Sequence, residues 1–86
     1  MSARSASILL ADLPDGERAT VVAVSGNGPS GPEPQHLRRL GELGFLPGES
    51  VQVLQRGPGG REPLAVLVGD TVFALRLVEA RCIIVE

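Results

Sequence analysis

The 86-residue chain predicts a mainly β fold: a small, strongly bent barrel of about five short strands, with one short α-helix inserted after the first strand. Short runs of β-branched residues alternate with polar residues and are separated by Gly/Pro-rich turns, which is typical of strands. One segment, 37–43, repeats leucine at helical spacing. Two Phe and no Trp or Tyr leave an aliphatic core. Because a flat sheet of such short strands would be marginal and would expose its edges, we expect the strands to curl into a barrel.

The first part of the chain supplies an entry segment, a strand and a loop. Residues 1–7 are small and polar, which predicts a loose end, and residues 8–13 form a brief apolar run that finishes in a turn at 13–16. Arg18–Val24 reads as the first strand. Residues 25–34 are rich in Gly and Pro, so we expect an irregular loop there.

The segment that follows the loop predicts a helix, a stop and a tight turn. Its apolar stripe consists of Leu37, Leu40 and Leu43. Gly44 follows the last leucine, where a left-handed residue ends a helix without steric cost. Pro47 and Gly48 then provide the fixed φ and the permissive residue at the centre of a type II turn. Because a helix this short is unstable alone in water, we expect it to dock on the strands.

The remaining strands follow at short intervals. The alternation from Val51 onwards predicts a strand over 51–56, and the glycine-rich residues 57–60 predict a turn. Residues 64–68 and 71–77 predict two strands joined by Gly69 and Asp70, which together form a two-residue hairpin signal. After a turn at 78–80, a last strand is expected over 81–85.

Size, charge and composition exclude several classes of protein. The length allows one domain, residues 1–86. The net charge of −2 argues against a nucleic-acid binder, which usually carries a basic face. No apolar stretch approaches the roughly 20 residues that span a bilayer, so membrane contact would come only through a partner. The single Cys82 lies in an apolar run, which favours a buried, reduced thiol in a cytoplasmic protein. No nucleophile stands beside a base, so we expect no enzyme activity.

The turn after the helix provides the candidate contact residues. Leu43 and Phe45 are better placed for the core, which leaves Leu46 at the tip of the turn beside Pro47. With His36, Arg38 and Arg39 nearby on the helix, Leu46 would be an apolar anchor with a basic rim, suited to a protein partner. A single exposed leucine is also an ordinary surface feature, so both interpretations stay open.

Metal ligands are sparse. His36 is the one histidine, and Glu33 and Glu42 are the nearest carboxylates, which makes these three weak candidates. No cluster of Cys and His has the spacing of a closed metal site, so no cofactor is required. A weakly bound surface ion such as Fe²⁺ or Zn²⁺ is compatible with this set.

Four segments in the same order resemble the FeoA family. Residues 39–51 (Arg-Leu-Gly-Glu-Leu-Gly-Phe-Leu-Pro-Gly-Glu-Ser-Val) resemble its central signature, and 10–16 its entry segment. Residues 65–76 resemble its hairpin ending in Ala-Leu-Arg, and 80–85 its closing strand. The Gly/Pro-rich loop over 26–34 is longer than the corresponding segment in the family's pattern.

The resemblance implies a cytoplasmic SH3-like β-barrel that assists bacterial ferrous iron uptake. The implied partner is FeoB, a membrane permease with a GTPase domain, and the implied action is to bind and modulate it; a weak homodimer is compatible with this role. Two alternatives stay open, because SH3-like barrels also serve as metal-responsive regulatory domains and as nucleic-acid- or ribosome-binding modules. The charge counts against the nucleic-acid alternative.

Overall fold

A computed structural model describes residues 7–25 and 34–86, without the side chains of 34–36, 60 and 61. Its strands are β1 (Ile8–Leu9), β2 (Arg18–Val24), β3 (Ser50–Gly57), β4 (Arg61–Val68), β5 (Thr71–Leu75) and β6 (Ile83–Val85). Its helices are α1 (Pro34–Leu43) and the single turn α2 (Leu77–Ala80), with 3₁₀ turns η1 (Leu10–Asp12) and η2 (Pro58–Gly60). The predicted loose end and most of the predicted 25–34 loop lie outside the described residues.

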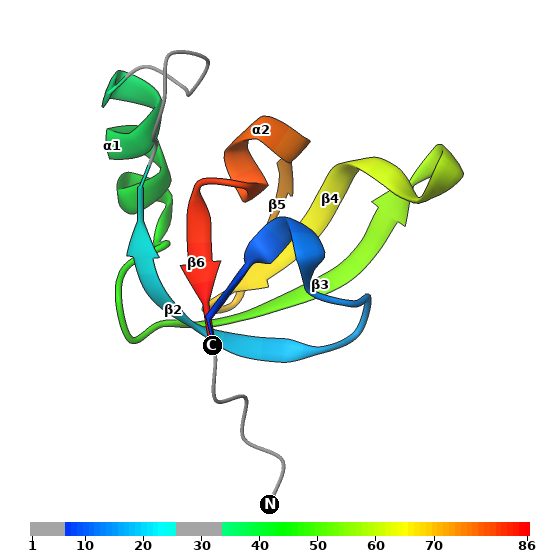
Figure 1. The fold of residues 1–86 in the computed structure, drawn as a ribbon, viewed down its shortest axis with the longest axis horizontal. Coiled ribbons are helices and arrows are strands. Elements are labelled where there is room, and N and C mark those ends of the chain that lie inside the picture. The colour runs from blue at the N-terminus through cyan, green and yellow to red at the C-terminus, as the bar shows by residue number, and fades with distance from the viewer. Residues whose placement is uncertain (1–6, 26–33) are drawn as a thin grey trace, which may run out of the picture.

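The strands form one antiparallel sheet in the order β1-β6-β2-β3-β4-β5 (Figure 1). β2 belongs to both halves of this sheet: its first residues pair with β3 and its later residues with β6. The register shifts between Val21 and Ala23 in β2, and twice along β3. Such irregularities bend strands and increase their twist, so short strands can curl around one core. The mainly β barrel with an inserted helix was therefore predicted correctly.

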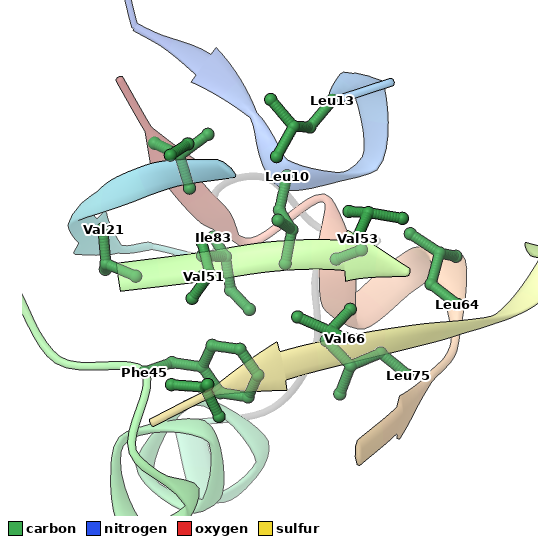
Figure 2. Packing of buried hydrophobic residues seen from close by; sticks show 14 of the residues in the cluster. Leu10, Leu13, Val21, Phe45, Val51, Val53, Leu64, Val66, Leu75 and Ile83 are labelled. Carbon is green, nitrogen blue, oxygen red and sulfur yellow. The ribbon is translucent and has the colours of Figure 1, made fainter. Parts of the chain in front are cut away.

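The core is aliphatic apart from Phe45. Leu10 and Leu13 reach it from the entry segment, β3 and β4 contribute alternate residues such as Val53 and Val66, and Ile83 comes from β6 (Figure 2). No buried side-chain polar atom among the described residues lacks a hydrogen-bond partner. Cys82 is buried with the apolar residues, as expected from its sequence neighbours, and its Sγ lies 3.2 Å from the carbonyl oxygen of Val78.

Helix α1 docks through the predicted leucine stripe. Leu40 is buried, and Leu37 and Leu43 are half-buried against the core. Gly44 ends the helix with φ 116°, in the left-handed region that glycine adopts most easily. Phe45, which follows it, is buried, and its ring centroid lies 6.2 Å from that of Phe73 on β5. The residues just after the helix thus fix α1 to the sheet.

Several elements differ from the sequence prediction. Ile8–Leu9 of the predicted apolar run form strand β1, so the sheet has six strands rather than about five and α1 follows the second strand rather than the first. β4 begins at Arg61 rather than at 64. β5 ends at Leu75 rather than at 77, and the expected turn over 78–80 is the helical turn α2. The main-chain N–H of Leu77 donates to Glu62 Oε1 (2.7 Å) and that of Arg76 to Glu79 Oε1 (2.9 Å), so two carboxylates cap the start of α2. These caps stop the strand early, and β6 starts at Ile83 instead of 81.

Candidate partner-binding surface

Main-chain hydrogen bonds hold the turn after α1 in place. Glu49 N–H donates to the carbonyl of Leu46 (3.0 Å) across Pro47 and Gly48, and Gly48 has φ 92°, as a type II turn requires. Gly48 N–H also donates to the carbonyl of Val21, whose own N–H donates to Glu49, both at 2.8 Å. The turn is therefore bonded directly to β2, and the residues at its tip are presented on a rigid support.

Leu46 is the exposed apolar residue of this turn. Half of its side chain, 51%, is accessible to solvent, while the preceding Phe45 is buried. It lies over the helix: a Cβ placed on Gly41 would be 3.8 Å from Leu46 Cδ2. Pro47 is exposed beside it. The expected exposure of Leu46 is confirmed, and Gly41 provides the flat surface on which it rests.

The two arginines of the predicted rim lie on different flanks of α1. At 3.6 residues per turn, Arg38 is about 60° from Gly41 around the helix, so it lies on the Leu46 flank. Arg39 is about 160° from Gly41, on the other side. Both arginines are exposed. Helical geometry therefore places Arg38 nearer to the Leu46 flank of α1 than Arg39.

Arg39 lines a groove of about 430 Å³ between α1, β5 and α2. Its apolar lining includes Leu43, Phe73 and Val78, and its polar lining consists of Arg39, Arg76 and Glu79. Glu79 already accepts the hydrogen bond from the main chain of Arg76. The sequence analysis did not predict this groove, because the groove depends on where β5 ends and α2 begins.

The three weak metal candidates are not brought into a site by the described residues. Glu33 and the side chain of His36 lie outside them, and Glu42 is exposed on α1. Within the described part of the chain, no three His, Cys, Asp or Glu side chains gather to hold an ion. The described residues therefore do not provide a closed site for a metal, and the candidates stay predictions.

Arg56 is a structural residue that the sequence analysis missed. Its guanidinium donates to the carbonyls of Ala11 (2.7 Å) and Leu13 (2.9 Å) and pairs with Asp15. These contacts tie the entry segment to β3. More than 40 residues separate Arg56 from its partners, so no local pattern could have shown the link.

Neither helix in the described chain has the length needed to cross a bilayer, since α1 has ten residues and α2 has four.

Comparison with known proteins gives a consistent result. The model of the FeoA domain family matches residues 8–86, whereas no curated protein matches. The crystal structure of Stenotrophomonas maltophilia FeoA complexed with zinc, described as a prokaryotic SH3 domain protein, has 42% identity and a TM-score of 0.80, over 92% of this chain and 89% of that one. The solution structure of FeoA from Chlorobium tepidum has 33% identity and a TM-score of 0.77, over 92% and 69%. A manganese-dependent transcriptional repressor shares the fold at 23% identity and a TM-score of 0.73, with 92% of this chain spanning 40% of that one.

Proposed function

The chain belongs to the FeoA family, and from this premise we propose that it is a small cytoplasmic, non-enzymatic accessory protein of bacterial ferrous iron uptake that binds and modulates the FeoB permease. The S. maltophilia relative is described as an SH3 domain protein for which a role as a ferrous iron transport activating factor is suggested, and this supports the proposal. Ferrous iron is the cargo of the transport system in this proposal, and this chain acts on the protein that carries the iron.

The observation that carries the proposal is the rigid presentation of Leu46. An apolar side chain that is 51% exposed on a turn bonded to β2 loses little entropy when a partner covers it. Arg38 on the same flank of α1 and Pro47 in the turn complete a small apolar surface with a basic edge. Apolar anchors with a polar rim are the usual centre of protein interfaces. We define this set, Arg38, Leu46 and Pro47, as the turn surface.

A membrane pull-down tests the turn surface. Tagged wild-type protein and Leu46→Asp are incubated with membranes that contain or lack FeoB. Leu54→Asp is the matched control, because Leu54 is 40% exposed on β3, outside the turn surface. We expect FeoB-dependent recovery of wild type and Leu54→Asp, and recovery at least about tenfold lower for Leu46→Asp, the size of an interface hot spot. Equal recovery of all three proteins, with or without FeoB, would contradict the proposal.

Weak divalent-metal binding is a second candidate function, favoured by the zinc complex of the S. maltophilia relative. In this candidate a surface ion is held by His36 with Glu33 or Glu42, alone or together with a neighbouring molecule. Anaerobic calorimetry with Fe²⁺, and separately with Zn²⁺, compares wild type with His36→Ala. Heat of binding that disappears in the variant supports the site. No heat at millimolar metal, or equal heat in both proteins, would argue against it.

A further inference from the structure

Strand β5 forms one edge of the sheet, and alternate residues along it direct their main-chain groups outward. Gly69 and Asp70 form a two-residue hairpin loop in which Gly69 has φ 62° and Asp70 has a negative φ, the pattern of a type II′ turn. Its closing pair, Val68 and Thr71, therefore exchanges the ladder hydrogen bonds. Antiparallel pairs alternate, so Val72 and Ala74 are non-hydrogen-bonded pairs with β4, and their N–H and C=O groups point away from it.

No described segment takes up these outward groups. β5 is last in the strand order, and none of the main-chain hydrogen bonds between described elements involves Val72 or Ala74. Both residues are exposed, Val72 by 53%. Within the part of the chain that the structure describes, the edge offers two N–H donors and two carbonyl acceptors at strand spacing.

This edge also lacks the features that usually prevent edge pairing. Its sequence, Thr-Val-Phe-Ala-Leu, contains neither a charged residue nor a proline, and its register with β4 has no bulge. The opposite edge, β1, is protected by being only two residues long. A five-residue, uncharged, regular edge is what an added strand requires.

The groove beside the edge indicates what kind of strand would fit. Leu43 and Phe73 supply an apolar floor, and the guanidinium groups of Arg39 and Arg76 lie at the groove without a hydrogen bond or ion pair to any described residue. Glu79 also lines it, but its carboxylate is engaged by the main chain of Arg76. Two uncommitted arginines favour carboxylates, which they can bind bidentately.

We propose that an extended segment of a partner protein, with alternating apolar and acidic residues, adds to the free edge of β5 and lies in the groove between α1 and α2. Its main chain pairs with Val72 and Ala74, and the apolar side chains on one face of the segment cover Leu43 and Phe73. Its carboxylates lie on the other face, where the long side chains of Arg39 and Arg76 reach them from the rim of the groove. Strand addition of this kind takes affinity from the main chain and specificity from alternate side chains. The proposal concerns the flank of α1 opposite the turn surface, so it does not rest on FeoB being the partner.

A peptide titration followed by ¹H–¹⁵N NMR tests the proposal on the purified chain. The probe is the capped hexapeptide Val-Glu-Val-Asp-Val-Thr, and the control peptide replaces both acidic residues by Lys. Ala74→Pro removes an N–H that points away from β4, so the ladder to β4 is retained and the variant can fold. Arg39→Glu reverses a groove charge, and Arg38→Glu is its matched control on the other flank of the same helix.

We expect saturable shifts of the Val72 and Ala74 amide signals with the acidic peptide, and binding at least about fourfold weaker with the lysine peptide, which loses two solvated ion pairs but keeps the main chain. Ala74→Pro should abolish binding, and Arg39→Glu should weaken it about two- to fivefold while Arg38→Glu leaves it unchanged, as for a solvated ion pair. If Ala74→Pro fails to fold, the comparison of peptide binding by Arg39→Glu and Arg38→Glu still tests the proposal. Shifts that are absent, that appear equally with the lysine peptide, or that are the same in Arg39→Glu and Arg38→Glu would overturn the proposal. None of these results depends on the membrane pull-down, so the two proposals can fail separately.

Discussion

Replacing Arg56 tests whether one guanidinium fastens the entry segment to the barrel. Its side chain is 15% exposed and makes two kinds of contact: hydrogen bonds to the main-chain carbonyls of Ala11 and Leu13, and an ion pair with Asp15, which is 51% exposed. The carbonyl contacts are partly buried and donated by a charged group, whereas the ion pair faces solvent. The two kinds of contact should therefore contribute very differently to stability.

The magnitudes follow from these environments. A hydrogen bond from a charged group contributes about 1.5–3 kcal/mol, so losing both carbonyl bonds in Arg56→Met should cost about 3 kcal/mol. Arg56→Lys retains the charge but lacks the planar fork, and keeping one of the two bonds should cost about 1.5 kcal/mol. Asp15→Asn removes only a solvent-exposed ion pair, which should cost about 0.5 kcal/mol.

Urea denaturation monitored by circular dichroism measures this series. For a protein of this size a slope of about 1 kcal/mol per molar urea converts the expected losses into midpoint shifts of about 3, 1.5 and 0.5 M for Arg56→Met, Arg56→Lys and Asp15→Asn. The order of the three variants is the decisive result. If Asp15→Asn costs as much as Arg56→Met, the ion pair dominates and the reasoning from the carbonyls is wrong.

Three further predictions concern packing and titration. Gly57→Ala would place a Cβ against the main-chain oxygen of Glu62, closer than van der Waals contact, and should lower the free energy of unfolding by at least about 2 kcal/mol in urea denaturation. Gly59→Ala, with φ 78° and open space around it, should lower it by about 1 kcal/mol. Phe45→Ala should cost about 3–5 kcal/mol, because the ring is fully buried; a smaller loss of thermal stability would show that the core collapses around the gap. Burial raises the pKa of the Cys82 thiol above its ordinary 9.0, so the folded protein binds the thiol proton more tightly than the unfolded chain. That stabilisation is complete below pH 9.0 and is lost as the pH rises through the raised pKa. In urea denaturation, the free energy of unfolding should therefore fall more between about pH 7 and pH 10 in wild type than in Cys82→Ala.

The elements that the sequence predicted well are those set by local patterns. Strand β2 has the predicted bounds, Arg18–Val24, because its residues alternate between polar and apolar at the start and are rich in valine throughout. The helix ends at Leu43 because Gly44 adopts the left-handed conformation. The presence of a glycine at this position was enough to predict that end. The hairpin at Gly69 likewise follows from a glycine at the first position of a type II′ turn.

What the sequence did not predict depends on contacts between distant segments. Leu77 continues the alternation of β5 beyond Arg76, so the strand pattern runs past Leu75, where the strand ends. The cap that Glu79 provides to Arg76 is local, but the cap on Leu77 comes from Glu62, fifteen residues earlier. The candidate contact residues were predicted as one cluster because 36–47 are close in sequence. Helical geometry separates Arg39 from Leu46, since neighbouring residues point 100° apart. The flank on which each residue lies could be assigned only once the structure showed how α1 is oriented on the sheet.

The separation of Arg38 from Arg39 provides a comparison that distinguishes the two proposed surfaces within one protein. Arg38 lies on the Leu46 flank of α1, while Arg39 lines the groove beside β5. Reversing either charge changes the net charge and the helix composition identically, so effects on folding and on long-range electrostatics cancel in the comparison. If only the turn surface binds a partner, Arg38→Glu weakens recovery from membranes and Arg39→Glu does not. If only the groove binds a partner, Arg39→Glu weakens binding of the acidic peptide and Arg38→Glu does not. A partner whose binding is weakened by Arg38→Glu and also by Arg39→Glu must therefore contact both flanks of α1, with the helix held between its two contact regions.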